Sequence, residues 1–515
     1  MARNYLDILA ETIRTNWDQL ALTDFYLTED GTAQDISRGN HYTYGEMYAE
    51  VCRVADLLTS LGLKKGDHIA ICGANSAHWA IAYLAVAKMQ GVSVTVMHSL
   101  QPDEIARLVT FSDAKVLFTD EDIWSELLSS FQGKAGDRLI SVVSLENWAV
   151  LKGKMQMISL PFREELEVGC PSFPQSEPDN LAMICFTSGT SGNAKGVMLC
   201  YRNLNNNVQN VDDIFPHSIN PTYVITLPLS HMYSFSLELM GQLCRGKSLL
   251  LFTALSSGDL TKIMKKVSPY MMCAVPGVLK IALQKNSTMT LQFLSRLEHL
   301  QIGGAKTEYL IEELLKTNKC RFSIGYGMSE TAPLIAMCAF SIYKSHSVGK
   351  IVSGMTARIS PAGEILVKGE NVMLGYYKDP EATARKIDKD GWLHTGDKGH
   401  LDEDGYLYVE GRLEQDMIVL PNGENIHPED IERKINALPE VKESIVLARE
   451  GKLVAIVVSK MSNEQSPMTN TDLRRHLLRT INPQLPLYSQ LYDVEITDIP
   501  LQKTEKQTIK RYLYK

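Results

Sequence analysis

Several features that would point directly to a function are missing from this chain of 515 residues. It has no run of about 18 apolar residues that could span a membrane, and its first residues lack the apolar centre of a signal peptide. Its nine cysteines are scattered, without a C-x-x-C pair or a cysteine–histidine spacing typical of zinc sites. We therefore expect a cytoplasmic protein without disulfides or structural zinc; peripheral contact with a membrane surface stays an open alternative.

An excess of basic residues is also absent. The formal net charge is −8, which argues against general nucleic-acid binding, because such binding requires a basic face. Hydrophobic residues make up 44% and charged residues 22% of the chain, as in ordinary globular proteins. A chain of this length exceeds one ordinary core, so we expect about two to four packed units.

The order of apolar runs and helical patterns predicts the fold class. Between residues 42 and 119, helix-like segments alternate with β-branched runs, which indicates a parallel sheet with crossover helices. Residues 120–178 show little helix or strand periodicity, and we expect them to connect the neighbouring elements or to cover them. Residues 345–411 have the short alternating pattern of a small β-rich unit. We expect an α/β fold with a large N-terminal domain of stacked mixed sheets and flanking helices, residues 1–411, joined by a hinge to a small α+β domain, residues 412–515.

A glycine-rich stretch from Phe186 to Gly196 follows an apolar run typical of a buried strand. It contains three glycines, four hydroxyl side chains and Lys195. Backbone N–H groups in such a loop can form an anion-binding concavity, to which a lysine adds positive charge. The stretch lacks the Gly-Lys-Ser/Thr of a Walker loop. It predicts a phosphate-binding loop, although a flexible surface loop would have a similar composition.

The same stretch resembles the signature of the adenylate-forming superfamily, which includes acyl-CoA synthetases, luciferases and peptide-synthetase adenylation domains. The family pattern is Tyr/Phe-Thr-Ser-Gly-Thr-Thr-Gly-x-Pro-Lys-Gly, and Ser191 and Ala194 are the two departures. The resemblance covers residues 40–511 in the family's motif order and is strongest to fatty acyl-CoA ligases. It implies an AMP-forming enzyme that uses ATP, Mg²⁺ and coenzyme A. The implied nucleotide-binding residues of the loop are Thr187, Ser188, Gly189, Thr190, Ser191, Gly192 and Lys195, the last also catalytic.

A second motif would complete the nucleotide site. Tyr326 lies between Gly325 and Gly327, which leave its ring free to lie against a purine, and Glu330 is a hard oxygen ligand suited to Mg²⁺. Ser329 can donate to a phosphate oxygen, although a turn followed by a helix N-cap would have the same residues. The run is similar to the family's Tyr-Gly-x-Thr-Glu motif. That similarity implies that Tyr326 stacks on adenine, Ser329 contacts the α-phosphate and Glu330 holds the metal during catalysis.

Thr395-Gly396-Asp397 resembles the family's Thr-Gly-Asp segment, which implies that Asp397 accepts hydrogen bonds from both ribose hydroxyls. Without the resemblance, a carboxylate in a loop is expected to be solvated. Arg412 follows a glycine at the domain boundary and resembles the family's ribose-contacting arginine.

A third set of segments resembles the family's acyl pocket. His231, in Leu-Pro-Leu-Ser-His, matches a catalytic position beside the acyl and CoA channel; by pattern alone it would begin the next helix. Small residues elsewhere would leave room for an acyl tail, although tight turns also explain the glycines. No charged partner for the acyl group is evident, so a medium- or long-chain fatty acid is the expected substrate. The implied pocket consists of His231, Val275, Gly303, Gly304, Ala305 and Met328.

The C-terminal domain carries two implied features. The run Gly423-Glu424-Asn425 resembles the loop that swings against the CoA tunnel, which favours CoA as the acceptor. The family is described as using two domain orientations, one for each half-reaction, so the domain is expected to be mobile. Glu414 lies at the matching pivot.

The C-terminal tail departs from the family pattern. The family reads Lys-Thr-x-Thr-Gly-Lys-Ile-x-Arg, and Thr508 stands where that pattern has the lysine that reaches the α-phosphate. A threonine cannot supply the charge. Lys506 and Lys510 would share the face of Thr508 in an extended segment, and either could replace the lysine in catalysis. Two alternatives stay open: an acyl-AMP ligase that loads an acyl carrier protein, and an adenylation-impaired homologue that binds acyl groups or adenylates.

Overall fold

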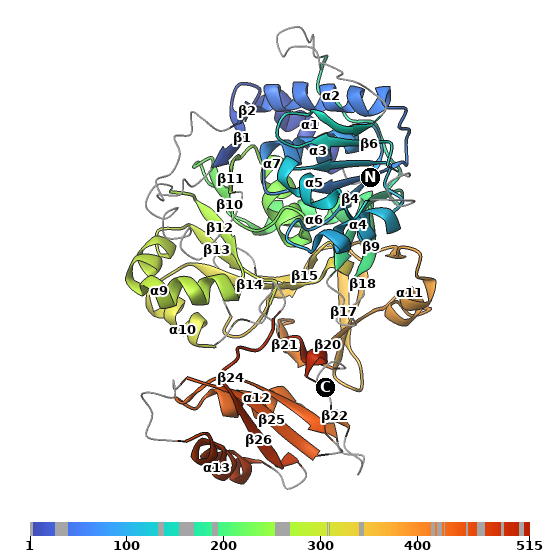
Figure 1. Cartoon of the computed structure of the whole chain (residues 1–515). Helices are drawn as coiled ribbons and strands as arrows, with labels where there is room; N and C mark the ends of the chain where they lie inside the picture. The colour runs from blue at the N-terminus through green and yellow to red at the C-terminus, as the bar shows by residue number, and fades with distance from the viewer. Residues whose placement is uncertain are drawn as a thin grey trace.

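The computed structural model describes residues 4–25, 40–131, 139–153, 169–187, 194–252, 268–305, 307, 309–338, 344–413, 418–419, 425–426, 428–449, 452–460, 469–485, 489–503 and 509–514. Figure 1 shows a large body of stacked sheets and helices, with a smaller sheet carrying the C-terminal helices below it. Within the described ranges, no helix has the length and apolar character needed to cross a membrane.

One mixed sheet of eight strands has the order β19-β9-β8-β4-β3-β5-β6-β7. Its strands are β3 (His68–Cys72), β4 (Val92–Thr95), β5 (Val116–Thr119), β6 (Ser141–Ser144), β7 (Val150–Gly153), β8 (Leu181–Thr187), β9 (Lys195–Cys200) and β19 (Gly375–Tyr376). The strands from β8 to β6 in this order are parallel, whereas β9 is antiparallel to β8 and β19 to β9. The glycine-rich stretch therefore joins two paired strands, and Lys195 begins the second.

A second sheet of nine strands has the order β16-β15-β14-β13-β12-β10-β11-β1-β2. Its strands are β1 (Leu20–Phe25), β2 (His41–Thr43), β10 (Thr222–Ile225), β11 (Ser248–Phe252), β12 (Met271–Ala274), β13 (His299–Ile302), β14 (Phe322–Gly327), β15 (Leu334–Met337) and β16 (Lys350–Ile351). The strands β10 to β14 form parallel pairs, and β15 returns antiparallel to β14. Tyr326 thus lies at the carboxyl end of a parallel strand, where ligands collect in α/β proteins.

Helices cover and separate these sheets. They are α1 (Tyr5–Thr15), α2 (Tyr44–Ser60), α3 (Ala77–Lys88), α4 (Pro102–Phe111), α5 (Glu121–Leu127), α6 (Tyr201–Ile214), the π-helix η3 (Ser234–Met240), α7 (Gly241–Leu243), α9 (Pro276–Leu294) and α10 (Tyr309–Thr317). The helix α3 is apolar on nearly every face and is buried from Ala77 to Ala87. Its side chains share one buried cluster with strands of both sheets, including Ile71 and Ile225. A helix that is hydrophobic all round belongs in such an interior.

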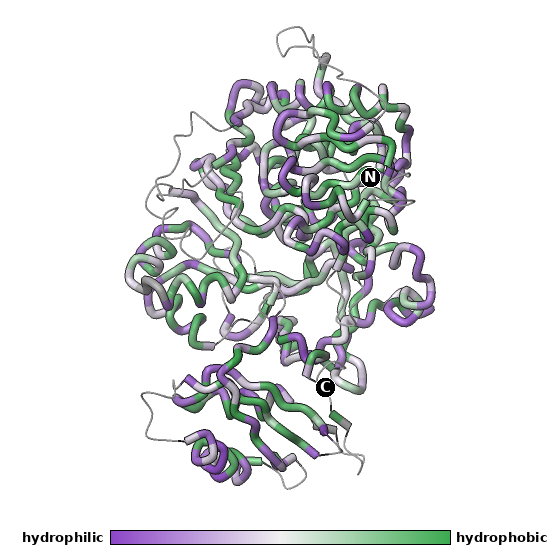
Figure 2. The backbone as a smooth tube through the Cα atoms, viewed as in Figure 1, coloured by the Kyte–Doolittle hydropathy of each residue, from purple (hydrophilic) through white to green (hydrophobic). Residues whose placement is uncertain are grey.

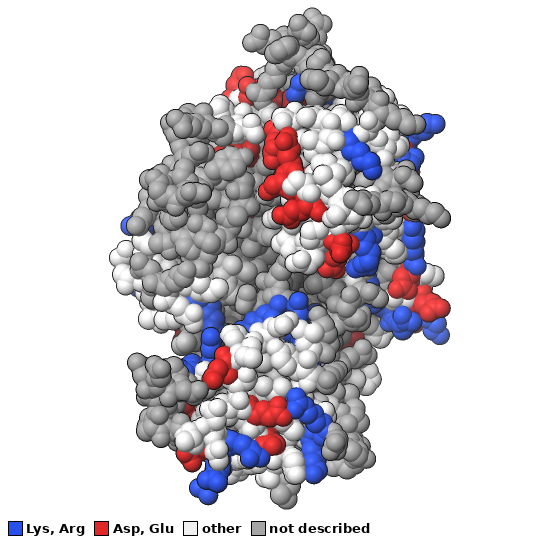
Figure 3. All heavy atoms as spheres, viewed as in Figure 1, with Lys and Arg blue, Asp and Glu red and all other residues white. Residues whose placement is uncertain are grey.

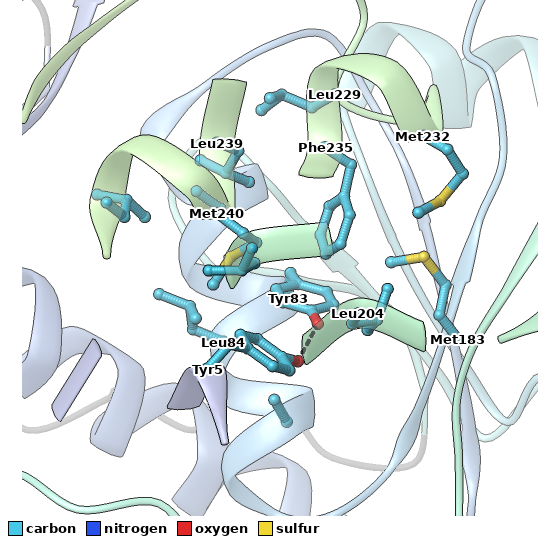
Figure 4. Close-up of a cluster of buried hydrophobic side chains, with 14 of the residues drawn as sticks. Tyr5, Tyr83, Leu84, Met183, Leu204, Leu229, Met232, Phe235, Leu239 and Met240 are labelled. Carbon is cyan, nitrogen blue, oxygen red and sulfur yellow. Dashed lines mark hydrogen bonds between the residues drawn. The ribbon is translucent and has the colours of Figure 1, made fainter. Parts of the chain in front are cut away.

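The first helix is tied to this core by a hydroxyl pair. The Tyr5 and Tyr83 hydroxyl oxygens lie 2.6 Å apart, and both rings are almost completely buried (Figure 4). Phe235 packs edge-to-face on Tyr83, with ring centroids 4.6 Å apart. Two hydroxyls can satisfy each other in an apolar interior, so this polar contact is compatible with the core around it.

Two smaller sheets follow. The first contains β17 (Met355–Ile359), β18 (Glu364–Gly369), β20 (Leu393–Leu401) and β21 (Leu407–Arg412), all antiparallel, with the helix α11 (Pro380–Lys386) inserted before β20. The second contains β24 (Val441–Arg449), β25 (Lys452–Ser459) and β26 (Asp493–Thr497), packed against α12 (Pro428–Asn436) and α13 (Asn470–Ile481). Short elements complete the chain: η4 (Ser329–Thr331), β22 (Ile418–Val419), β23 (Asn425–Ile426), η5 (Asn482–Gln484) and η7 (Arg511–Leu513). Figure 2 shows apolar segments along the sheet strands and polar ones in the outer turns.

The structure corrects the expectation for residues 120–178. This stretch contains α5, β6 and β7, and β6 extends the parallel sheet beside β5. The sequence of β6, Ser-Val-Val-Ser, is four residues long and all four are buried, so no alternation of exposed and buried positions marks it. The predicted domain boundary at residues 411–412 stays a prediction.

Candidate nucleotide site

Three of the predicted residues meet at one buried carboxylate. The Tyr326 hydroxyl donates to Asp397 Oδ2 at 2.5 Å, and Arg412 Nε lies 3.0 Å from Asp397 Oδ1. Asp397 and Arg412 face each other in the antiparallel register of β20 and β21, which fixes the ion pair. Burial raises the pKa of Asp397, and the positive charge of Arg412 opposes that shift. The site therefore holds an ionisable acid in an environment from which water is largely excluded.

Glu330 anchors a second cluster beside the first. Its side chain is buried, and Glu330 Oε1 accepts a hydrogen bond of 2.7 Å from the Tyr376 hydroxyl. The Lys195 ammonium lies over the Tyr376 ring, 4.9 Å from the centroid. The pairing of β19 with β9 brings Tyr376 opposite Val197, two residues from Lys195. The phosphate-loop lysine and the predicted metal carboxylate thus approach the same tyrosine, which the sequence analysis missed.

The turn that presents Glu330 depends on close packing. A Cβ atom at Gly327 would lie 1.8 Å from the Pro333 carbonyl oxygen, so no side chain fits there. The 3₁₀ turn η4 begins at Ser329 and is closed by Ala332, whose φ is 59°. At Gly327 the glycine is required by the approach of the following chain, whereas the sequence suggested that it frees the tyrosine ring. Ser329 and Glu330 are therefore held on a rigid turn at the end of β14.

Lys386, the last residue of α11, is a second functional candidate that the sequence analysis missed. Its ammonium donates to the Thr395 carbonyl oxygen at 3.1 Å, and Arg412 Nη1 donates to the same oxygen at 3.3 Å. Burial lowers the pKa of Lys386, while the carboxylate of Glu330 opposes that shift. In the sequence, Lys386 follows Arg385 in a charged helix and looks like an ordinary solvated residue, so no local signal marks it.

Several of the predicted acyl-pocket residues lie around Tyr233, whose ring occupies part of the space beside Gly303. A Cβ atom at Gly303 would lie 3.2 Å from the Tyr233 ring, whose hydroxyl donates to the Gln301 carbonyl oxygen at 3.1 Å. His231 Nδ1 accepts the Tyr233 amide at 3.2 Å. Gly304 has φ of +81°, as the tight-turn alternative requires, and a Cβ there would lie 3.3 Å from Val275 Cγ1. The Tyr233 ring therefore occupies part of the space beside Gly303. The role of this region in acyl binding stays a prediction.

Some of the remaining predicted residues lie within the ranges that the structure describes, and others lie outside them. Thr187 ends β8, Met328 is partly buried against the main core, and Ala305 is exposed. Asn425 lies in β23, and the Lys510 amide donates to the Gln502 carbonyl oxygen at 2.8 Å. The predicted residues that lie outside the described ranges are Ser188, Gly189, Thr190, Ser191, Gly192, Glu414, Gly423, Glu424, Lys506 and Thr508.

The residues present fit a magnesium ion bound mainly by its nucleotide. Among the described residues, no group of three or more His, Cys, Asp or Glu side chains could enclose a metal. Magnesium bound to a nucleotide commonly uses one or two protein carboxylates, with phosphates and water completing its shell. Glu330, oriented by Tyr376, supplies such a carboxylate.

Comparison with known families identifies the chain. The model of the AMP-binding enzyme family matches residues 11–377, and the model of the AMP-binding enzyme C-terminal domain matches residues 415–514. The chain belongs to the AMP-binding enzyme family. The predicted superfamily, its α/β fold class and its assignment as an AMP-forming acid–thiol ligase are confirmed. ATP and CoA as substrates fit this family.

Curated relatives include two plant enzymes. The 4-coumarate–CoA ligase 3 of Oryza sativa subsp. japonica is 28% identical over 491 residues, which cover 90% of this chain and 85% of the relative. The 4-coumarate–CoA ligase 3 of Arabidopsis thaliana is 28% identical over 492 residues, covering 89% and 83%.

Solved structures share the fold. ATP-bound MatB from Rhodopseudomonas palustris superimposes with a TM-score of 0.81 at 22% identity, covering 99% of this chain and 98% of that one. The o-succinylbenzoate CoA synthetase MenE of Bacillus subtilis, bound to its acyl-adenylate, has a TM-score of 0.78 at 23% identity, covering 100% and 98%. The likeness extends over the whole chain, including the C-terminal sheet.

Proposed function

We propose that this AMP-binding enzyme activates a carboxylic acid at the cluster around Tyr326, Asp397 and Glu330. The carboxylate oxygen attacks the α-phosphorus of ATP, the bond to pyrophosphate breaks, and acyl-AMP forms. The CoA thiolate then attacks the acyl carbonyl and releases AMP. The ion pair of the buried Asp397 carboxylate with Arg412, together with the hydrogen bond from the Tyr326 hydroxyl, is the observation that supports this proposal most directly.

Each residue would have a defined task in this reaction. Asp397, held by Arg412, would accept hydrogen bonds from the ribose hydroxyls, and Tyr326 would lie against adenine. Lys195 and Ser329 would contact phosphate oxygens. Glu330 would hold Mg²⁺, which would neutralise phosphate charge. Fixed charges in a site that excludes water stabilise developing charge without reorganisation.

The proposed substrate is a compact acid. A Cβ atom at Gly303 would lie 3.2 Å from the Tyr233 ring, so this ring takes part of the space that the sequence assigned to an acyl tail, which favours a shorter acid. Relatives are named for 4-coumarate and for o-succinylbenzoate, both aromatic acids. A Mycobacterium tuberculosis fatty acyl CoA synthetase also shares the fold, with a TM-score of 0.72. We place an aromatic or short acid first and a medium- or long-chain fatty acid second.

The acceptor is proposed to be CoA, with the C-terminal domain turning about Glu414 between the two half-reactions. Figure 3 shows Lys and Arg side chains gathered on this face at the waist between the large body and the C-terminal sheet. Positive charge there would favour the approach of anionic ATP and CoA. An acyl carrier protein is the alternative acceptor, and the cytoplasmic location stays a prediction.

The test is pyrophosphate release from ATP and Mg²⁺ with aromatic, short and long-chain acids, with CoA, with a phosphopantetheinyl carrier protein, or with neither. We expect release with one acid class and thioester formation with CoA. Asp397→Asn should reduce turnover at subsaturating ATP about 100-fold, because a neutral amide cannot keep the Arg412 ion pair. Asp390→Asn, on an exposed turn, should leave turnover unchanged.

A second measurement separates the alternatives. Thioester formation from pre-made acyl-AMP without ATP-dependent pyrophosphate release would identify an adenylation-impaired homologue, as Thr508 allows. No activity with either ATP or acyl-AMP would contradict the proposal.

A further inference from the structure

Lys386 places an ammonium group beside the Thr395 turn of the candidate nucleotide site. Its side chain is partly buried, and its ammonium donates to the Thr395 carbonyl oxygen. None of the ion pairs among the described residues includes it. An ammonium has three donors, so this single acceptor leaves capacity for a ligand. A partly buried ammonium with unused donors is suited to bind an anionic group of a ligand.

The surroundings place this cation between the two clusters of the site. The carboxylates of Glu330, Asp397 and Glu364 are close enough to Lys386 to stabilise its protonated form. The positive charge of Arg412 is also close and disfavours that form. Asp397 would mark the ribose end of a bound nucleotide, and Glu330 with Lys195 would mark the end that carries the metal-bound phosphates. The α-phosphate joins ribose to those phosphates. It would therefore lie between these two ends, and Lys386, which contacts the Thr395 carbonyl oxygen beside the Asp397–Arg412 pair and is influenced by the charge of Glu330, is placed to reach it.

We propose that the Lys386 ammonium binds the 5′-phosphate of the nucleotide, which in ATP is the α-phosphate. The assignment rests on the proposed function, because it takes the Tyr326–Asp397 cluster as the nucleoside site. A fixed cation at this phosphate stabilises the charge that develops as the acid attacks phosphorus. Lys386 belongs to the N-terminal body of the chain. Its charge would be in place whatever the orientation of the C-terminal domain, and would supply positive charge that Thr508 lacks.

The experiment compares adenosine with AMP, which differ only in the 5′-phosphate, by calorimetric titration at neutral pH. In the wild type, AMP should bind more tightly than adenosine. Lys386→Met should weaken AMP about 10- to 100-fold and leave adenosine unchanged, as for loss of a hydrogen bond between charged groups. Lys386→Arg should restore most of the preference for AMP. The control is Lys389→Met, an identical substitution at an exposed position three residues away.

The outcomes separate this inference from the proposed function. If Lys386→Met binds AMP as the wild type does, Lys386 does not contact phosphate, and the proposed function is unaffected. If AMP and adenosine weaken equally, Lys386 only supports the Thr395 turn, and the inference is wrong. If the wild type binds neither compound, the nucleoside site itself is wrong and both proposals fall. Thermal unfolding of each variant checks that it is folded.

A pH profile gives a second readout. The preference for AMP requires a protonated Lys386, so it should decline as pH rises through a pKa that lies below the ordinary lysine value. In Lys386→Arg the preference should persist, because a guanidinium does not deprotonate in this range. An identical decline in both proteins would contradict the inference.

Discussion

The interior around α3 and the candidate nucleotide site both contain buried polar groups, yet the two regions differ in how much charge they hold. In the interior, hydroxyls such as Tyr5 and Tyr83 satisfy each other, and apolar side chains surround them. In the site, Glu330, Asp397, Arg412 and Lys386 lie close together, and one cation has no ion-pair partner among the described residues. The interior is mainly apolar, whereas the candidate site gathers charged groups that an anionic ligand would complement. The comparison predicts that stability and function depend on different groups.

The largest expected effect lies in the interior. Trp79 of α3 is fully buried, and Trp79→Ala should lower the free energy of unfolding by about 3–5 kcal/mol, through lost burial and the cavity left behind. Denaturant unfolding measures the change. Trp17→Ala, at a side chain 38% exposed, is the control and should have a smaller effect. Equal losses would mean that the helix between the sheets is no more important than the surface.

A substitution in the candidate site should reduce turnover and leave stability largely unchanged, in contrast to Trp79→Ala. Glu330→Gln keeps the size of the side chain but removes its charge, so Mg²⁺-dependent ATP turnover should fall about 10- to 100-fold. The unfolding free energy should stay unchanged or rise, because a buried charge is removed. Kinetics at varied Mg²⁺ and denaturant unfolding test both parts. Glu381→Gln, at the exposed start of α11, is the control and should change neither. Unchanged turnover would remove Glu330 from the site.

A smaller effect sharpens the comparison, because the interior also holds buried acids, of which Asp24 is one. Asp24 of β1 accepts a 2.6 Å hydrogen bond from the Ala77 amide at the start of α3. Burial raises its pKa from 3.8 to about 6. The folded chain therefore keeps this proton over a range where the unfolded chain has lost it. Unfolding free energy should fall as pH rises through that range, by about 1–3 kcal/mol in total.

Asp24→Asn should remove this part of the pH dependence, and Asp18→Asn, at an exposed position, should not. Unfolding in denaturant at pH values between about 4 and 7 measures the slope. A slope that survives in Asp24→Asn would assign it to another acid, of which Asp120 is the first to examine, since burial raises its pKa to about 6 as well.

The sequence named several residues that the structure brings together in the candidate site, because the signals that mark them are local. Tyr326 between two glycines, Asp397 after Thr-Gly and the lysine of the glycine-rich stretch each sit in a short run whose chemistry can be read without the fold. Predictions were less accurate where the outcome depends on contacts with distant parts of the chain. Gly303 was expected to leave room, but Tyr233 from another part of the chain occupies some of it. Residues 120–178 were expected to connect, but β6 gains its place by pairing with β5.

By itself, the sequence determined the α/β class and the order of the family's motifs, and it named candidate nucleotide-binding residues, because periodicity, turns and motifs are encoded over a few neighbouring positions. Only the tertiary structure decided that Tyr376 links Lys195 to Glu330, and that Lys386 shares the Thr395 carbonyl oxygen with Arg412. The first contact arises because β19 pairs with β9, and the second arises because the end of α11 packs against β20. Burial and electrostatic environment are properties of that three-dimensional neighbourhood, and an exposed lysine and a partly buried one have the same letter in a sequence.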